Sequence, residues 1–265
     1  MPASIPNDIY QYSLHSAYAA GLREGGPPVA FLTNHGTHGI GFFESYEDAP
    51  EDRPGDMIQL DSVAYEIDKD GNAAVADKQD QMPFVKVVVF QPSKRVKLET
   101  SMASKKVLEI LQMGKNTPMS VRIKGPFKYL NTQQETFWDV SGEIFGYAIP
   151  SWQKDVSGEG LQSCFITQDK KKGGRVVDFE TEEGATLEWA KCGRFHLGFP
   201  QDEEYEKLSL SGTNNHFCFA TVEALSKGAP VLYKGPNFAP NSGNSLVGMA
   251  PEKTFNHWWK HLQMY

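Results

Sequence analysis

The sequence contains few cysteines, no long apolar run and no excess of basic residues. Three cysteines among 265 residues are too few, and odd in number, for the disulfide framework of a secreted protein. No apolar stretch approaches the roughly 18 residues of a membrane-spanning helix. The N-terminal segment MPASIPNDIY lacks the basic and apolar regions of a signal peptide. We therefore expect a cytoplasmic protein that binds no membrane.

The charge balance disfavours nucleic acid as a partner. The formal net charge is -7, and basic residues are scattered along the chain apart from the run Lys170–Lys172. Proteins that bind nucleic acid typically carry a basic patch or stripe. With 40% hydrophobic and 22% charged residues, the composition is that of a soluble globular protein with one large core or two smaller ones.

Most of the chain has the pattern of β-strands. Helices are expected only at residues 8–22 and 101–115, where apolar residues recur at helical spacing. Alternating or β-branched segments predict strands within residues 56–76, 83–92, 119–130, 142–150, 160–179 and 185–193. Within the first of these, Asp70-Gly71 marks a hairpin turn. The expected fold class is α+β, rich in β-structure and with few helices.

One strand-turn-strand segment brings three polar side chains together. In GLQSCFITQDKKKGGRVVDF, residues 160–179, Gln162 and Cys164 lie two positions apart, so they point to the same face of a strand. A tight return through the basic, glycine-containing turn brings Arg175 back beside them. The spacing therefore predicts a three-pronged site.

The order of several short motifs carries a family resemblance. They are Tyr12-Ser13, HGTHGIG at 35–41, GDMI at 55–58, Leu60-Asp61 ahead of Tyr65, Pro83-Phe84, RIKG at 122–125, GLQSCFITQD at 160–169 and GGRVVD at 173–178. Between Tyr10 and Trp189 the chain resembles the α-acetolactate decarboxylases, zinc enzymes that convert a branched 2-hydroxy-3-keto acid to acetoin. The resemblance implies a two-subdomain mixed sheet and barrel, a pocket between the halves, a small-molecule substrate and a homodimer.

The same resemblance implies a loss of the metal site. The zinc-binding histidines of the family fall on Gln162, Cys164 and Arg175, and its acidic ligand falls on Asp56, a carboxylate on a shorter arm. A guanidinium cannot ligate zinc and a carboxamide rarely does. The interval that carries the family's active-site arginine is shorter here and contains no arginine. We therefore expect neither a metal nor another cofactor.

Without the metal, the residues at these positions suggest electrostatic and acid-base catalysis. Arg175 would hold developing negative charge, as a planar fork of donors suited to carboxylate or enolate oxygens. Gln162 would orient the substrate, and His38 or Asp56 would move protons. In the alternative interpretation Arg175 only pairs with a buried acid such as Asp56, which leaves a filled and inert site.

Each of the other candidate site residues also has a purely structural interpretation. Cys164 is either a nucleophile or a small buried hydrophobic residue. His35 and His38 flank a glycine-rich turn, where they would exchange protons or cap the turn, and with Asp56 they would form a new metal site. The pocket would be lined by Glu135, Trp138 and the nearby Trp152, or these side chains would pack in the core.

Composition divides the chain near residue 205. Residues 1–205 form the expected β-rich body of two closely packed halves, and residues 206–265 are richer in glycine, proline and asparagine. We expect the second part to be a C-terminal extension that packs on the body. By analogy with the family its FNHWWKH segment would fold over the pocket, or it would anchor the tail to the body or to a partner subunit.

Three functional hypotheses follow. The leading one is a zinc-independent enzyme of lyase, isomerase or cyclase type that acts on a small oxygenated molecule in specialised metabolism. The second is a non-catalytic protein that binds such a molecule on the same scaffold. The third is an acetolactate decarboxylase with a relocated metal, which the three replaced histidines disfavour.

Overall fold

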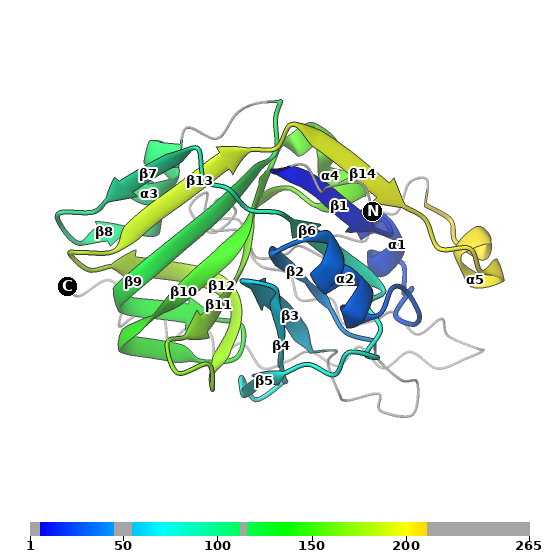
Figure 1. Ribbon diagram of the computed structural model, residues 1–265, viewed down its shortest axis with the longest axis horizontal. Coiled ribbons are helices and arrows are strands. Elements are labelled where there is room, and N and C mark those ends of the chain that lie inside the picture. The colour runs from blue at the N-terminus through cyan, green and yellow to red at the C-terminus, as the bar shows by residue number, and fades with distance from the viewer. Residues whose placement is uncertain (1–5, 45–54, 112–115, 211–265) are drawn as a thin grey trace, which may run out of the picture. The chain divides into compact units, whose positions relative to one another are not determined.

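Two seven-stranded sheets form the body of the protein (Figure 1). The computed structural model describes residues 6–44, 55–111 and 116–210. The first sheet has the order β14-β1-β6-β2-β3-β4-β5, and its strands are antiparallel except for the parallel pair β1 and β14. Its strands are β1 (Asp8–Tyr12), β2 (His38–Phe42), β3 (Asp56–Leu60), β4 (Val63–Ile67), β5 (Ala73–Val75), β6 (Phe84–Val88) and β14 (Arg194–Gly198).

The second sheet contains a closed ring of strands. Its order is β7-β13-β9-β10-β11-β12-β8, and an additional pairing of β12 with β9 joins the ends of the four central strands. Its strands are β7 (Lys94–Lys97), β8 (Met102–Ala103), β9 (Met119–Thr132), β10 (Thr136–Ile149), β11 (Gly160–Thr167), β12 (Gly173–Thr181) and β13 (Thr186–Lys191). The ring encloses apolar side chains that include Phe127, Phe165 and Phe179.

The helices of the described residues are short. They are α1 (His15–Ala19), α2 (Val29–His35), α3 (Ser104–Leu111), the 3-10 helix η1 (Ser151–Gln153), α4 (Lys154–Ser157) and α5 (Glu203–Lys207). In these parts of the chain no helix is long and apolar enough to cross a membrane. The β-rich α+β fold class is therefore confirmed, and the predicted strands all form.

Two local predictions were wrong. Residues 8–22 do not form one helix, because Asp8–Tyr12 is a strand between β6 and β14, and only His15–Ala19 is helical. The strand pairing outweighs the helical spacing of the apolar residues. HGTHGIG is not a simple turn either, since His35 ends α2 and His38 begins β2. The helix predicted at 101–115 forms as Ser104–Leu111.

The two sheets pack against each other through one shared core. Ile40, Ile58 and Val88 of the first sheet and Phe145 and Ile166 of the second belong to the same cluster of buried side chains. Alternation along each strand decides which side chains face this core. On β6, Phe84, Lys86 and Val88 share one face, whereas Val85 and Val87 belong to a separate cluster on the opposite face.

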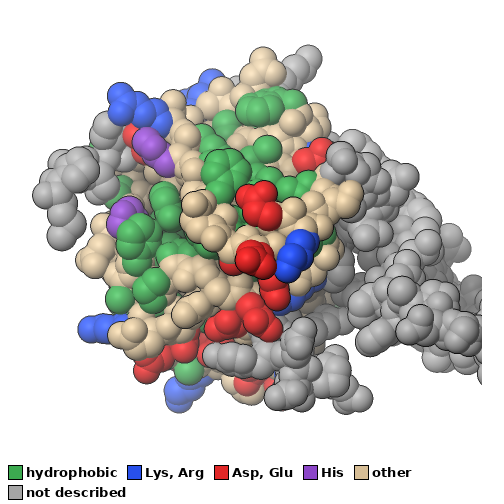
Figure 2. All heavy atoms as spheres, turned by 90° about the vertical axis from the view of Figure 1, so that its right-hand side faces the viewer, with side chains coloured by type: hydrophobic (Ala, Val, Ile, Leu, Met, Phe, Trp, Pro, Cys, Tyr) green, Lys and Arg blue, Asp and Glu red, His purple; other side chains and the backbone are tan. Residues whose placement is uncertain are grey.

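Figure 2 shows one face of the molecule, on which acidic side chains group near the centre and the Lys and Arg side chains of the described residues lie apart from one another.

The absence of a nucleic-acid partner stays a prediction, as does the homodimer. The C-terminal extension, residues 211–265 of which lie outside the described part of the chain, also stays a prediction, including its FNHWWKH segment.

Candidate functional site between the two sheets

The first sheet contributes a row of aromatic and charged side chains at one end of the shared core. Phe42 lies opposite both Asp56 and Phe84 in the strand register. Lys86 follows two residues after Phe84, so its side chain points to the same side of the sheet. These residues come from three neighbouring strands, which fixes their spacing by backbone pairing.

The second sheet supplies the three residues of the predicted site. Arg175 lies directly opposite Cys164 in the pairing of β11 with β12, as the spacing predicted. Gln162 lies two positions away on β11 and pairs with Tyr147 on β10. Gln162 and Arg175 are only 3% and 4% exposed, and Cys164 is fully buried, so the site lies inside the protein.

A buried ion pair joins the two sheets. Nε and Nη2 of Arg175 donate to the same oxygen of Asp56, at 3.0 and 2.7 Å, and Gln134 Nε2 donates to the other carboxylate oxygen at 3.1 Å. The guanidinium carbon lies 4.3 Å from the centre of the Phe42 ring. Burial by itself would lower the pKa of Arg175, but the Asp56 carboxylate outweighs that effect and the pKa is raised.

A second cation, which the sequence reasoning missed, lies in the same region. The ammonium group of Lys86 donates to Gln162 Oε1 at 2.5 Å and to the backbone oxygen of Ser157 at 3.0 Å. It lies 5.5 Å from the ring centres of both Phe84 and Tyr147. Complete burial, followed by the charge of Arg175, holds the pKa of Lys86 well below its usual range.

The N-terminal segment places two more titratable groups near these cations. Burial, Lys86 and Arg175 lower the pKa of His15 to about 3. Burial raises the pKa of Tyr18 to about 12, and the Tyr18 ring stacks on Phe42 with centres 4.3 Å apart. A neutral histidine beside two cations indicates an electropositive site that favours anions.

The donor set does not suit zinc. Arg175 donates two hydrogen bonds to Asp56, and Gln162 accepts one from Lys86 through its amide oxygen, so Cys164 alone of the three positions offers a usual zinc ligand. The described part of the chain contains no group of three or more His, Cys, Asp or Glu side chains placed to hold a metal. The metal site of the resemblance is therefore not rebuilt at these three positions.

His38 and His35 lie away from Arg175. His38 begins β2 and Phe42 ends it, so His38 lies about 13 Å along the strand from the ring that contacts the guanidinium. Its side chain packs against Phe90 and Phe145 and lies 3.6 Å from Asp61. His35 is exposed at the end of α2 and stacks on Phe31, with ring centres 3.8 Å apart. The structure thus brings Asp56 to Arg175 but neither histidine.

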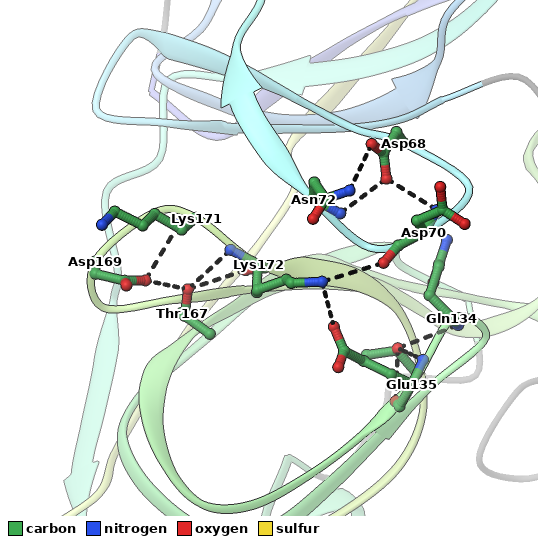
Figure 3. A network of polar contacts seen from close by, with 10 residues as sticks. Asp68, Asp70, Asn72, Gln134, Glu135, Thr167, Asp169, Lys171 and Lys172 are labelled. Carbon is green, nitrogen blue, oxygen red and sulfur yellow. Dashed lines mark hydrogen bonds and ion pairs between the residues drawn. The ribbon is translucent and has the colours of Figure 1, made fainter.

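Glu135 and Trp138 occupy the outer part of the β9–β10 hairpin. Glu135 forms an ion pair with Lys172 at 3.4 Å, and Lys172 also donates to the backbone oxygen of Asp70, so three turns from both sheets meet here (Figure 3). Trp138 is 69% exposed and Trp152 65% exposed. These residues hold or flank turns, whereas Gln134, next to Glu135, reaches the buried ion pair.

The comparisons with known proteins agree with this architecture. A family profile described as "Alpha-acetolactate decarboxylase" matches residues 9–136 and 131–212. This chain belongs to the alpha-acetolactate decarboxylase family. An alpha-acetolactate decarboxylase of Methanosarcina mazei is 30% identical over 235 residues, which cover 76% of this chain and 79% of that protein. That of Klebsiella aerogenes is 25% identical over 238 residues, covering 81% and 88%.

Solved structures of the family share its fold. The alpha-acetolactate decarboxylase of Bacillus subtilis strain 168 superimposes with a TM-score of 0.70 at 23% identity, covering 78% of this chain and 94% of that one. At this identity the likeness establishes the acetolactate decarboxylase fold alone. The family assignment itself rests on the sequence matches.

Sequence signals for the missed residues were present but weak. Lys86 interrupts the otherwise apolar run FVKVVVF, and a charge inside a buried strand is unusual enough to mark a special position. Gln134 and His15 carry no such signal, because polar residues in turns and at helix starts are common. Their proximity to Asp56 and Lys86 depends on the packing of distant segments.

The buried His38 and the partly buried His15, whose pKa values are both lowered, predict a loss of stability in mild acid. Burial also lowers the pKa of His38, to about 4. Because folding depresses both pKa values, the unfolded chain binds protons below pH 6.5 that the folded chain does not, and stability falls down to about pH 4 for His38 and about pH 3 for His15. Each histidine contributes up to about 1.4 kcal/mol per pH unit within its window.

Urea unfolding at pH 6.5, 5.8 and 5.0 measures this dependence. His38→Gln and His15→Gln should each reduce the slope of the free energy of unfolding against pH. A slope unchanged in both variants would contradict the assignment of the proton uptake to these two side chains.

Proposed function

We propose that this chain is a zinc-independent enzyme of the lyase class that acts on a small keto or hydroxy acid on the acetolactate decarboxylase scaffold. Membership of the family supports a lyase, and the names of the curated relatives make decarboxylation the favoured reaction. Isomerisation or cyclisation uses the same kind of electrostatic site. The observation that carries the metal independence is the replacement of the ligand positions by Gln162, Cys164 and Arg175, the last of which donates to Asp56.

The buried cations support an acidic substrate. Two basic side chains, Arg175 and Lys86, share a single carboxylate, Asp56, and burial, followed by the charge of Arg175, lowers the pKa of Lys86. A substrate carboxylate would add negative charge beside Arg175 and so support a positive charge on Lys86 or on a group bound to it. Preorganised donors of this kind stabilise charge that develops in a transition state, and removal of one typically costs about 10²- to 10³-fold in rate.

The roles of individual residues are part of the proposal. Arg175 would stabilise an enolate or enediolate oxygen, and Gln162 would orient the substrate through its amide. Asp56 keeps the guanidinium in place and is the proton carrier nearest to it. His38 would require a relay of protons along β2 to take part, since its contacts are to Phe90, Phe145 and Asp61.

One observation favours the second candidate, a protein that binds the ligand without turnover. Two donors of Arg175 go to Asp56, and both residues are about 95% buried, which is the arrangement expected of a filled, structural ion pair. Turnover assays separate the two candidates. A keto acid would raise the unfolding temperature of a binding protein, but that protein would release no carbon dioxide.

Metal content and chelator sensitivity test the proposal directly. We expect purified protein to contain far less than one zinc per chain and to release carbon dioxide from a panel of small 3-keto acids, acetolactate included, at a rate that dipicolinate leaves unchanged. The matched control is a curated relative of the family assayed beside it. Stoichiometric zinc together with chelator-sensitive acetoin release would overturn the metal independence and support a relocated metal.

A further inference from the structure

Lys86 is a lysine placed where a strand otherwise carries only apolar side chains. All five residues of β6 are buried, and Lys86 itself is fully buried, at 0% exposure. Loss of hydration makes an ammonium ion costly at such a position unless a carboxylate pairs with it. A lysine at a position where burial disfavours its charge is a candidate for a catalytic role rather than a packing role.

Its polar partners stabilise an amine without supplying a counter-charge. Nζ donates to the Gln162 amide oxygen and to a backbone oxygen, and two aromatic rings flank it. Within the described residues no carboxylate forms an ion pair with Lys86. Asp56, the acid of the same site, is paired with Arg175. Complete burial and the nearby Arg175 guanidinium outweigh these contacts and lower the pKa of Lys86, which favours the neutral amine with its nucleophilic lone pair.

We propose that Lys86 is the reactive amine of this site and forms an imine with the ketone of a small 3-keto acid, whose carboxylate lies beside Arg175. This inference rests on the proposed function and names its substrate class. It gives the site an electron sink that needs no metal, since a protonated imine withdraws electrons as a Lewis acid does.

The steps balance in atoms and electrons. The Nζ lone pair attacks the ketone carbon, and with one proton from solvent the carbonyl oxygen leaves as water, which gives the protonated imine. The bond between the adjacent carbon and the carboxylate then breaks. Its electron pair forms the carbon-carbon double bond of a neutral enamine, and carbon dioxide leaves. A proton adds to carbon, and water hydrolyses the resulting imine to release the ketone, the amine and a proton.

An unpartnered donor next to Lys86 supports this site independently. Gln162 accepts from Lys86 through Oε1, which leaves its Nε2 pointing elsewhere, buried and without a hydrogen-bond partner in the structure. Gln162 is 3% exposed, so the cost of this orphan donor is a reason to expect a ligand oxygen. Nε2 lies against Gly158, the residue after α4, so a ligand oxygen would reach Nε2 when this segment moves.

The short helix α4 lies against the Lys86 amine. Ser157, which accepts from Lys86, ends the four-residue helix α4, and its hydroxyl donates to Gln11 of β1 at 2.7 Å. Gln11 in turn donates to the backbone of Val156 at 2.7 Å. Short helices held by a few polar contacts open at less cost than the core strands do. Movement of α4 would therefore expose Nζ while the sheets stay intact.

Reductive trapping tests the proposal on the full chain. The protein is incubated with acetoacetate at pH 7, reduced with borohydride and mapped by peptide mass spectrometry. We expect an adduct on Lys86 whose added mass is that of the keto acid, or of acetone after loss of carbon dioxide, less one oxygen atom. Its occupancy should exceed that on an exposed lysine such as Lys128 by about tenfold or more, because an ordinary amine is almost entirely protonated at this pH.

Two variants and one control sharpen the result. Lys86→Arg keeps a cation but cannot form an imine, and Lys86→Met serves if the arginine variant does not fold; either should lose the adduct and turnover together. Lys128→Arg should change neither. Metal-independent turnover without an adduct on Lys86 would overturn this inference and leave the proposed function intact. Chelator-sensitive turnover in zinc-loaded protein would overturn the proposed function itself.

Discussion

Replacing Arg175 by methionine is expected to lower the free energy of unfolding by about 3–5 kcal/mol, because the buried Asp56 carboxylate would lose its partner. Both side chains are nearly inaccessible and 2.7 Å apart. The same variant should lose about 10²- to 10³-fold in turnover if the guanidinium stabilises developing charge. Urea unfolding at pH 7, with carbon dioxide release measured under conditions where the variant is folded, records both effects.

Two further variants separate pairing from general disruption. Arg175→Met combined with Asp56→Leu removes both charges, and replacement of a buried pair by apolar residues is often neutral or stabilising, so much of the lost stability should return while turnover stays low. Lys128→Met breaks the exposed pair with Glu180 at 3.3 Å and should cost about 1 kcal/mol or less. Equal losses at the two pairs would show that the buried pair has no special structural role.

Truncating Phe165 should destabilise the closed ring of the second sheet by about 3–5 kcal/mol. The Phe165 side chain is fully buried and packs against Phe127 and Phe137, with ring centres 5.7 and 5.3 Å away. Phe165 follows Cys164 on β11 and points into the ring, away from the site. Phe165→Ala therefore tests how much the packing inside the ring contributes to the stability of the second sheet.

Thermal and urea unfolding of Phe165→Ala measure the loss. Phe199→Ala is the matched control, since Phe199 is 48% exposed and the change should cost less than about 1 kcal/mol. A comparable loss in both variants would mean that the ring is not where the stability of the second sheet is concentrated.

The strands were predictable because their signal is local. Alternation and β-branched residues identified β3 to β6 and β9 to β13, and the basic turn placed Arg175 opposite Cys164. The helix predicted for the N-terminal segment was wrong because the structure of this segment depends on distant strands. Asp8–Tyr12 is a strand because β6 and β14 pair with it, and β14 lies at the far end of the described sequence.

At the centre of the site, too, sequence patterns did not predict contacts between distant segments. The sequence correctly suggested a pairing of Arg175 with Asp56 as an alternative, but it gave no reason to place Lys86 against Gln162. These pairs are separated by 119 and 76 residues along the chain. Propensity and periodicity carry no information about which faces of two sheets come together at such separations.

Sequence alone determined the family resemblance and the β-rich fold class, and it predicted the replacement of the metal-binding side chains, because each depends on residue identity or on spacing within one short segment. Tertiary structure decided which charges meet. Packing of β2, β3 and β6 against β11 and β12 buries Asp56 with Arg175 and places His38 at the other end of β2. Among the described residues it leaves Lys86 without a carboxylate partner. Burial and neighbouring charges set the pKa values, and both are brought together only in the folded chain.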